Sequence, residues 1–276
     1  MRTWSFAKGH GTLNDFVLLM DRNAWLDPSP DDVRFLCDRR RGLGADGLLR
    51  AVWSQAMPDW DGTDDVWFMD YRNADGSVAE TCGNGLRVFV RWLADQGLVS
   101  GSVVPVATRA GLRHGVLLPG GRVAVTMGRP VWSPGPTVIE YAGRAWNGHW
   151  VDVGNPHIVV RVASREELTD LDLSQPAQLD PSVAPQGANL EFVWAEMANR
   201  LTMRVWERGV GETMSCGTGV VAAALDARQA DGGRHDTIQV DVPGGRLKVT
   251  FDDAGEATLA GPAVVVAEGE VVLPDD

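Results

Sequence analysis

The chain has 276 residues, 44% of them hydrophobic, and a formal net charge of −12 at pH 7. This length suits two domains, and the apolar share is enough for a full core. The negative charge, without any basic stripe, excludes a nucleic-acid partner, and no apolar run approaches the roughly 18–20 residues of a membrane span, so we expect no membrane partner either.

The start of the chain, Met1-Arg-Thr-Trp-Ser-Phe6, reads as a strand and has no signal-peptide core. The three cysteines are an odd number, form no Cys-x-x-Cys pair and have no histidine cluster nearby. These features argue against both a disulfide framework and a structural zinc site. We therefore expect a cytoplasmic protein with reduced thiols and no metal.

The first cysteine, Cys37, lies on a plausible amphipathic helix that ends at Arg39-Arg-Arg41, and we interpret it as a small buried hydrophobic residue. Next comes Gly42-Leu-Gly-Ala-Asp-Gly47, a match to the dinucleotide pattern G-x-G-x-x-G. In a dinucleotide site the glycines follow a strand and open a helix. Here a helix precedes them and the strand-like residues 48–53 follow, which predicts a glycine-rich turn and no nicotinamide cofactor.

The other two cysteines occur in matching surroundings. Cys82 and Cys216 each begin a Cys-Gly-x-Gly sequence, follow a strand-like alternation and precede an apolar run of helical length that stops at glycine. Such an ordered repetition predicts two related units facing a shared cleft. The corresponding segments are strands 66–71 and 201–206, helices 86–93 and 220–225, and the turns Pro119-Gly-Gly-Arg-Val123 and Pro243-Gly-Gly-Arg-Leu247.

Proline-rich punctuation, Pro130-Val-Trp-Ser-Pro-Gly-Pro136, marks the expected boundary between the halves. The N-terminal half is then 1–130, carrying Cys82, and the C-terminal half is 131–261, carrying Cys216. The β-branched end, from about 262 to 276, reads as a strand that can return to the N-terminal half. A second proline cluster predicts a surface loop around residues 176–185.

Cys-Gly-x-Gly at a helix start can support a specific chemistry. The first backbone N–H groups of a helix have no partner within it and favour an anion such as an α-carboxylate. The same field lowers the pKa of a cysteine placed just before the helix. Two thiols on opposite sides of one α-carbon are what a cofactor-free racemase or epimerase needs, since one removes a proton and the other delivers one. The alternative is a pair of structural cysteines.

Several motifs together resemble the diaminopimelate epimerase family, in the order of that family and across essentially the whole chain. They are Phe6-Ala-Lys-Gly-His-Gly-Thr-Leu-Asn-Asp-Phe16, Gly42-Leu-Gly-Ala-Asp-Gly47, Asn73-Ala-Asp-Gly-Ser77 with Cys82-Gly-Asn-Gly85, Gly154-Asn-Pro-His157, Gly187-Ala-Asn189, and Glu207-Arg-Gly-Val-Gly-Glu212 with Cys216-Gly-Thr-Gly219.

The resemblance implies an α/β (α+β) fold of two pseudosymmetric halves, each a curved, mostly antiparallel sheet wrapped around a central helix, and a homodimer. It implies catalysis by Cys82 and Cys216, with their protonation tuned by His157 and Glu207. The substrate-binding residues that it implies are Asn14, Asn73, Gly83, Asn84, Asn155, Asn189, Glu207, Arg208, Gly217 and Thr218.

The implied reaction is epimerisation of LL-diaminopimelate to meso-diaminopimelate without a cofactor, for lysine and peptidoglycan precursor synthesis. Two alternatives are a two-cysteine racemase of the same fold acting on another amino acid, and a catalytically silent binding protein, which should have lost a cysteine. Two positions depart from the family: Leu13 stands where a smaller or polar residue is usual, and Gly47 where some members carry a polar side chain.

Overall fold

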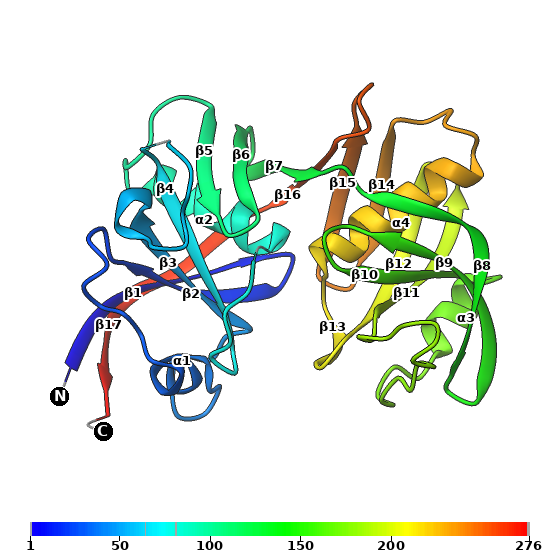
Figure 1. Ribbon diagram of the computed structural model, residues 1–276, viewed down its shortest axis with the longest axis horizontal. Coiled ribbons are helices and arrows are strands. Elements are labelled where there is room, and N and C mark those ends of the chain that lie inside the picture. The colour runs from blue at the N-terminus through cyan, green and yellow to red at the C-terminus, as the bar shows by residue number, and fades with distance from the viewer. Residues whose placement is uncertain (1, 64, 81, 275–276) are drawn as a thin grey trace. The chain divides into compact units, whose positions relative to one another are not determined.

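A computed structural model describes residues 2–63, 65–80 and 82–274. The chain forms two compact units, the first made of residues 1–125 and 261–276 and the second of residues 126–260. Both units contain many strands and few helices (Figure 1). The expected α/β class is therefore confirmed.

The first unit contains most of the elements before residue 125 together with the last strand. Its elements are β1 (Arg2–Gly11), β2 (Asn14–Met20), α1 (Pro30–Cys37), β3 (Gly47–Trp53), the short 3-10 helix η1 (Ser54–Ala56), β4 (Trp67–Asn73), α2 (Gly83–Asp95), β5 (Val103–Thr108), β6 (Gly111–Leu118), β7 (Arg122–Gly128) and β17 (Val264–Leu273).

The second unit contains the remaining elements, and β7 and β16 each extend across a boundary between the units. Its elements are β8 (Val131–Tyr141), β9 (Arg144–Asp152), β10 (Pro156–Arg161), α3 (Arg165–Asp170), β11 (Asn189–Met197), β12 (Arg200–Glu207), β13 (Gly211–Thr213), α4 (Gly217–Ala230), β14 (Thr237–Val242), β15 (Gly245–Phe251) and β16 (Ala257–Pro262).

Antiparallel and parallel strand pairings follow one another in the same order in the two units. In the first, β17, β1 and β2 are antiparallel neighbours, β2 pairs β3 in parallel, β3 pairs β4 antiparallel, and β4 pairs β5 in parallel. In the second, β8, β9 and β10 are antiparallel, β10 pairs β11 in parallel, β11 pairs β12 antiparallel, and β12 pairs β14 in parallel. Antiparallel hairpins complete both sheets. The predicted pseudosymmetric, mostly antiparallel halves are confirmed.

One helix lies inside the sheet of each unit (Figure 1). Helix α2 contacts β1 to β4, β6 and β17, and every residue from Gly83 to Val90 is buried. Helix α4 contacts β9 to β12, β14 and β15, and every residue from Val220 to Ala227 is buried. Small and apolar residues on all sides are typical of such an enclosed helix. In the described part of the chain, no helix has both the length and the apolar character for a membrane crossing.

Cys37 is buried in the apolar cluster around Val33 and Leu36, and burial raises the pKa of its thiol to about 12. Its assignment to packing is confirmed. The helix that carries it is shorter than predicted, because Asp38 leaves the helical region and its Oδ1 accepts the N–H groups of Arg40 and Arg41. The following glycines form a turn into β3, as predicted. A Cβ on Gly42 would lie 1.8 Å from the carbonyl oxygen of Phe35, so the turn needs glycine there.

The proline-rich stretch 130–136 becomes part of a strand. Its residues from Val131 onward begin β8, and the pairing with β9 shifts register between Trp132 and Pro136. A bulge of this kind accommodates prolines, which cannot donate to the ladder. The second proline cluster does lie in a loop, since residues 171–188 contain neither helix nor strand.

Candidate active site

Cys82 and Cys216 have the same local geometry. Each is the N-cap residue of the enclosed helix of its unit, with an extended backbone, and each sulfur accepts a backbone N–H from three residues ahead. The two distances, from Gly85 N to Cys82 Sγ and from Gly219 N to Cys216 Sγ, are both 3.4 Å. Serine, threonine, aspartate and asparagine are the usual residues at this position. N-cap preference therefore does not explain a cysteine at both positions, whereas a reaction that uses both thiols does.

The residues predicted to bind the reacting carboxylate are the first two residues of these helices. Gly83 and Asn84 open α2, and Gly217 and Thr218 open α4. The N–H groups of a first helical turn point away from the helix beside the positive end of its dipole. Both pairs thus occupy positions at which a carboxylate can be bound.

Asn14 lies beside Cys82 in the first unit. Its side-chain oxygen accepts Asn84 Nδ2 at 3.2 Å and lies 3.9 Å from Cys82 Sγ, while its own Nδ2 donates to Asp46 Oδ2 at 2.8 Å. The amide is therefore fixed with its oxygen toward the thiol. The turn before it has positive φ at Thr12 (54°) and Leu13 (62°), a strained conformation for these residues.

Asn73 is held differently. It ends β4, and its side-chain Nδ2 donates to the hydroxyl of Ser77 at 3.0 Å. Its backbone N–H donates to the Ser77 carbonyl, so the two residues close the loop that follows the strand. These hydrogen bonds connect Asn73 to the loop that follows β4.

Arg87, one turn into α2, was not among the residues predicted from sequence. It is fully buried, and its guanidinium donates to Asn84 Oδ1 at 2.9 Å and to Thr12 Oγ1 at 3.2 Å. Burial lowers the pKa of Arg87 to about 10, whereas the negative charge of a Cys82 thiolate acts to raise it. Because that attraction is mutual, Arg87 favours the thiolate form of Cys82.

Cys216 lies in an acidic setting instead. The partly buried Glu207 carboxyl accepts the Thr213 hydroxyl, and burial raises the pKa of Glu207. Burial, followed by the charges of Glu207 and Glu191, raises the pKa of Cys216 well above its usual value. The sequence predicts the opposite, a pKa lowered by the field at the start of the helix. The bond from Gly219 N does act in that direction, but burial and the two carboxylates outweigh it.

His157 is fully buried on β10 and connects three other side chains. Its Nδ1 lies 2.7 Å from Glu191 Oε1 and 3.5 Å from Asn189 Nδ2, and its Nε2 lies 3.0 Å from Asn155 Oδ1. The structure therefore brings together the predicted Asn155, His157 and Asn189 and adds Glu191, which sequence reasoning missed. A signal was present, because Glu191 is a charged residue between the apolar Leu190 and Phe192, two residues from Asn189 and so on the same face.

Arg208 joins this group through its backbone, since its N–H donates to Asn189 Oδ1 at 2.9 Å. Its exposed side chain donates from Nη1 to the Gln186 carbonyl at 2.6 Å. A Cβ on Gly187 would lie 3.0 Å from Arg208 Cδ, and Gly187 also has a positive φ of 72°. Glycine at 187 thus lets the arginine lie across the loop.

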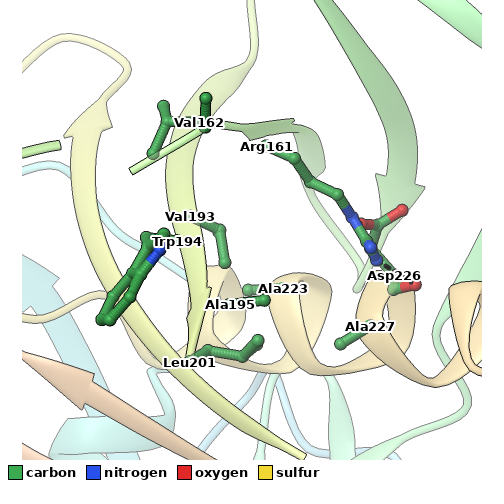
Figure 2. A pocket seen from close by; sticks show the side chains of 10 residues that line it. Arg161, Val162, Val193, Trp194, Ala195, Leu201, Ala223, Asp226 and Ala227 are labelled. Atoms are coloured by element: carbon green, nitrogen blue, oxygen red, sulfur yellow. Dashed lines mark hydrogen bonds and ion pairs between the residues drawn. The ribbon is translucent and has the colours of Figure 1, made fainter. Parts of the chain in front are cut away.

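The second unit also has a small cavity of about 130 Å³ farther along α4 (Figure 2). There the Arg161 Nε donates to Asp226 Oδ2 at 2.7 Å, and Trp194 and Leu201 line the apolar side. None of the predicted site residues lines this cavity. Within residues 2–63, 65–80 and 82–274, no three His, Cys, Asp or Glu side chains are grouped as metal ligands.

Solved structures with this fold include a PhzF-family phenazine biosynthesis protein of Bacillus anthracis (TM-score 0.73, 14% identity), which covers 99% of this chain and 100% of that chain. Another is a hydroxyproline epimerase of Agrobacterium vitis (TM-score 0.70, 16% identity), covering 99% of this chain and 94% of that one. At such identities the likeness shows the fold alone.

Sequence relatives are much closer. The diaminopimelate epimerase of Thermobifida fusca is 51% identical over 275 residues, which cover 97% of this chain and 98% of that protein. The diaminopimelate epimerase of Corynebacterium glutamicum strain ATCC 13032 is 46% identical over 277 residues, covering 98% and 99%. A family model described as diaminopimelate epimerase matches residues 6–133 and 149–273. The chain therefore belongs to the diaminopimelate epimerase family.

Proposed function

We propose that this protein interconverts LL- and meso-diaminopimelate, as an isomerase of lysine and peptidoglycan precursor synthesis. The observation that carries the proposal is the duplicated N-cap thiol, Cys82 on α2 and Cys216 on α4, in a chain about half identical to named diaminopimelate epimerases. We expect the enzyme to act in the cytoplasm, as a homodimer and without a cofactor.

In the proposed reaction the α-carboxylate of the substrate binds to the first-turn N–H groups of both helices, at Gly83 and Asn84 and at Gly217 and Thr218. One thiolate takes the α-proton and becomes a thiol, leaving a carbanion whose charge spreads into the carboxylate. The opposite thiol gives its proton to the other face of the carbon and becomes the thiolate. The protein ends with the two protonation states exchanged, and the N–H donors stabilise the charge that develops.

The charges around the two thiols support a division of roles. Buried Arg87 favours a thiolate at Cys82, whereas Glu207 and Glu191 favour a protonated thiol at Cys216. We propose that the resting enzyme holds this pair of states. Cys82 would then remove the proton in the first direction of reaction and Cys216 would supply one.

The remaining predicted residues would bind the rest of the substrate. Asn14 faces Cys82, and Asn155 and Asn189 surround His157. Neutral amides can satisfy an ammonium group or a carboxylate without adding charge, and the guanidinium of Arg208 suits the distal carboxylate. We propose Asn73 and Glu207 as further contacts.

Exchange of solvent deuterium tests the proposal. In deuterated buffer, the purified protein should place deuterium at the α-position of diaminopimelate and convert the LL isomer to the meso isomer. Lysine, proline and glutamate should exchange negligibly. Exchange on proline or lysine at a rate equal to that on diaminopimelate would point instead to a racemase of another amino acid, and no exchange on any amino acid would overturn the proposal.

A further inference from the structure

We propose that Glu191 is a positioning residue, whose carboxylate accepts Nδ1–H of His157 and thereby holds Asn155 and Asn189 in the orientation that receives the substrate. The inference rests on the proposed function, since it concerns the same group of side chains. It assigns His157 a role in orienting the substrate-binding amides, beyond any effect on the thiols.

The contacts form a continuous chain through the imidazole. Glu191 Oε1 lies 2.7 Å from Nδ1, and Asn155 Oδ1 lies 3.0 Å from Nε2 on the opposite side of the ring. Asn189 Nδ2 packs 3.5 Å from Nδ1 without a hydrogen bond when Nδ1 carries the proton, and Asn189 Oδ1 accepts the Arg208 N–H at 2.9 Å. A rotation of the buried ring would therefore disturb both asparagines.

Glu191 is placed where a carboxylate has no evident structural benefit. It is fully buried on β11, and among the described residues its Oε2 has no hydrogen-bond partner. Burying a charge with one partner costs free energy that an apolar residue would not. The helix opposite is shaped around it, since a Cβ on Gly219 would lie 2.5 Å from Glu191 Oε1. Because burial of this carboxylate costs free energy and the neighbouring helix leaves space for it, we infer that Glu191 has a function in the site.

The chemistry of the carboxylate sets the state of the ring. An ionised carboxylate only accepts hydrogen bonds, so Nδ1 must carry the proton that joins it to Glu191. Asn155 Oδ1 is an acceptor as well, so its 3.0 Å contact with Nε2 is a hydrogen bond when that nitrogen also carries a proton. The other ionisable groups that act on this part of the site are Glu207 on β12 and Cys216 at the start of α4. In the described part of the chain neither is hydrogen-bonded to the imidazole, so Glu191 is the carboxylate that fixes the ring.

Glu191→Gln is the first test, because glutamine keeps the shape and removes the charge. Its amide can present either an oxygen or an NH₂ group to Nδ1, so the ring is no longer fixed. We expect kcat/KM for diaminopimelate to fall about 10- to 100-fold. Losses of this size are typical when the carboxylate that orients a metal-binding histidine is removed, and Glu191 orients His157 by the same kind of hydrogen bond. Most of the loss should be a rise in KM. Glu196→Gln, at an exposed position of the same strand where Glu196 pairs with Arg200, should keep wild-type values.

A second measurement needs no substrate. Two-bond ¹H–¹⁵N correlations of the imidazoles, with His157 assigned by its loss in His157→Gln, should show a protonated Nδ1 in the wild-type protein and a loss of this preference in Glu191→Gln. A wild-type ring without a proton on Nδ1 overturns the inference, whether or not the variant folds. So does a folded Glu191→Gln enzyme with unchanged KM. If the NMR result is as expected but diaminopimelate does not exchange, the proposed function fails while the Glu191–His157 link stands.

Discussion

The charge of the Glu207 carboxyl acts on the thiol of Cys216 and raises its pKa, and the same carboxyl accepts the Thr213 hydroxyl. Cys82 has a different neighbour, the fully buried cation Arg87. The two thiols therefore share one N-cap geometry but differ in the sign of the nearby charge. These opposite charges give a physical reason why one cysteine is held as a thiolate and the other as a thiol, which is what the proposed reaction needs.

Both cysteines should be indispensable. Because each face of the α-carbon needs its own proton carrier, Cys82→Ala and Cys216→Ala should each lower epimerisation to a trace while the circular dichroism spectrum is kept. Cys37→Ala is the matched control and should keep wild-type activity, since Cys37 is buried in apolar packing. Substantial turnover by either single variant would contradict a two-base reaction.

Cys216 should react slowly with alkylating agents at neutral pH. Its pKa is raised, so the reactive thiolate forms only at higher pH, and below that pKa its alkylation rate should rise about tenfold per pH unit. Glu207→Gln removes a neighbouring negative charge and should shift this rise to lower pH. Peptide mapping after iodoacetamide treatment measures both rates. Glu212→Gln, whose carboxylate pairs with Arg204, is the control. Equal rates in wild type and Glu207→Gln would rule out this electrostatic effect.

Arg87→Met should slow alkylation of Cys82 by on the order of tenfold, because the cation that favours its thiolate is lost. The variant also leaves Asn84 Oδ1 and Thr12 Oγ1 without this donor, so its thermal unfolding should begin at a lower temperature. Arg91→Met, one turn along the same helix and paired with Asp95 at the surface, should change neither property. A Cys82 rate that is unaffected in a folded Arg87→Met protein would show that Arg87 has only a structural role.

Arg208→Met should reduce kcat/KM for diaminopimelate by on the order of 10²-fold or more, because the distal carboxylate loses its guanidinium. The rates of alkylation of both catalytic thiols should stay unchanged, which separates this loss from damage to the cysteines. Arg200→Met removes another arginine of the same unit, which pairs with Glu196 and Asp241, and should be silent. Wild-type kinetics for Arg208→Met would remove Arg208 from the substrate site.

Much of the fold could be predicted from the sequence because its signals are local. The alternation before each Cys-Gly-x-Gly predicted β4 and β12, and the apolar runs after it predicted α2 and α4. Their duplicate order predicted two similar units. Boundaries were less certain, since the end of α1 at Cys37 depends on the Asp38 side chain capturing two N–H groups, which periodicity does not report.

Two thiols before glycines at helix starts, and the motifs that carry the family resemblance, can be read from the sequence alone. The charge around each thiol depends on residues that the fold brings together. Arg87 reaches Thr12 across 75 positions of the chain, and Glu191 reaches His157 across 34. The pKa of a buried group depends on desolvation and on charges brought near it by folding. No local pattern contains that information, so the raised pKa of Cys216 and the role proposed for Glu191 came from the structure.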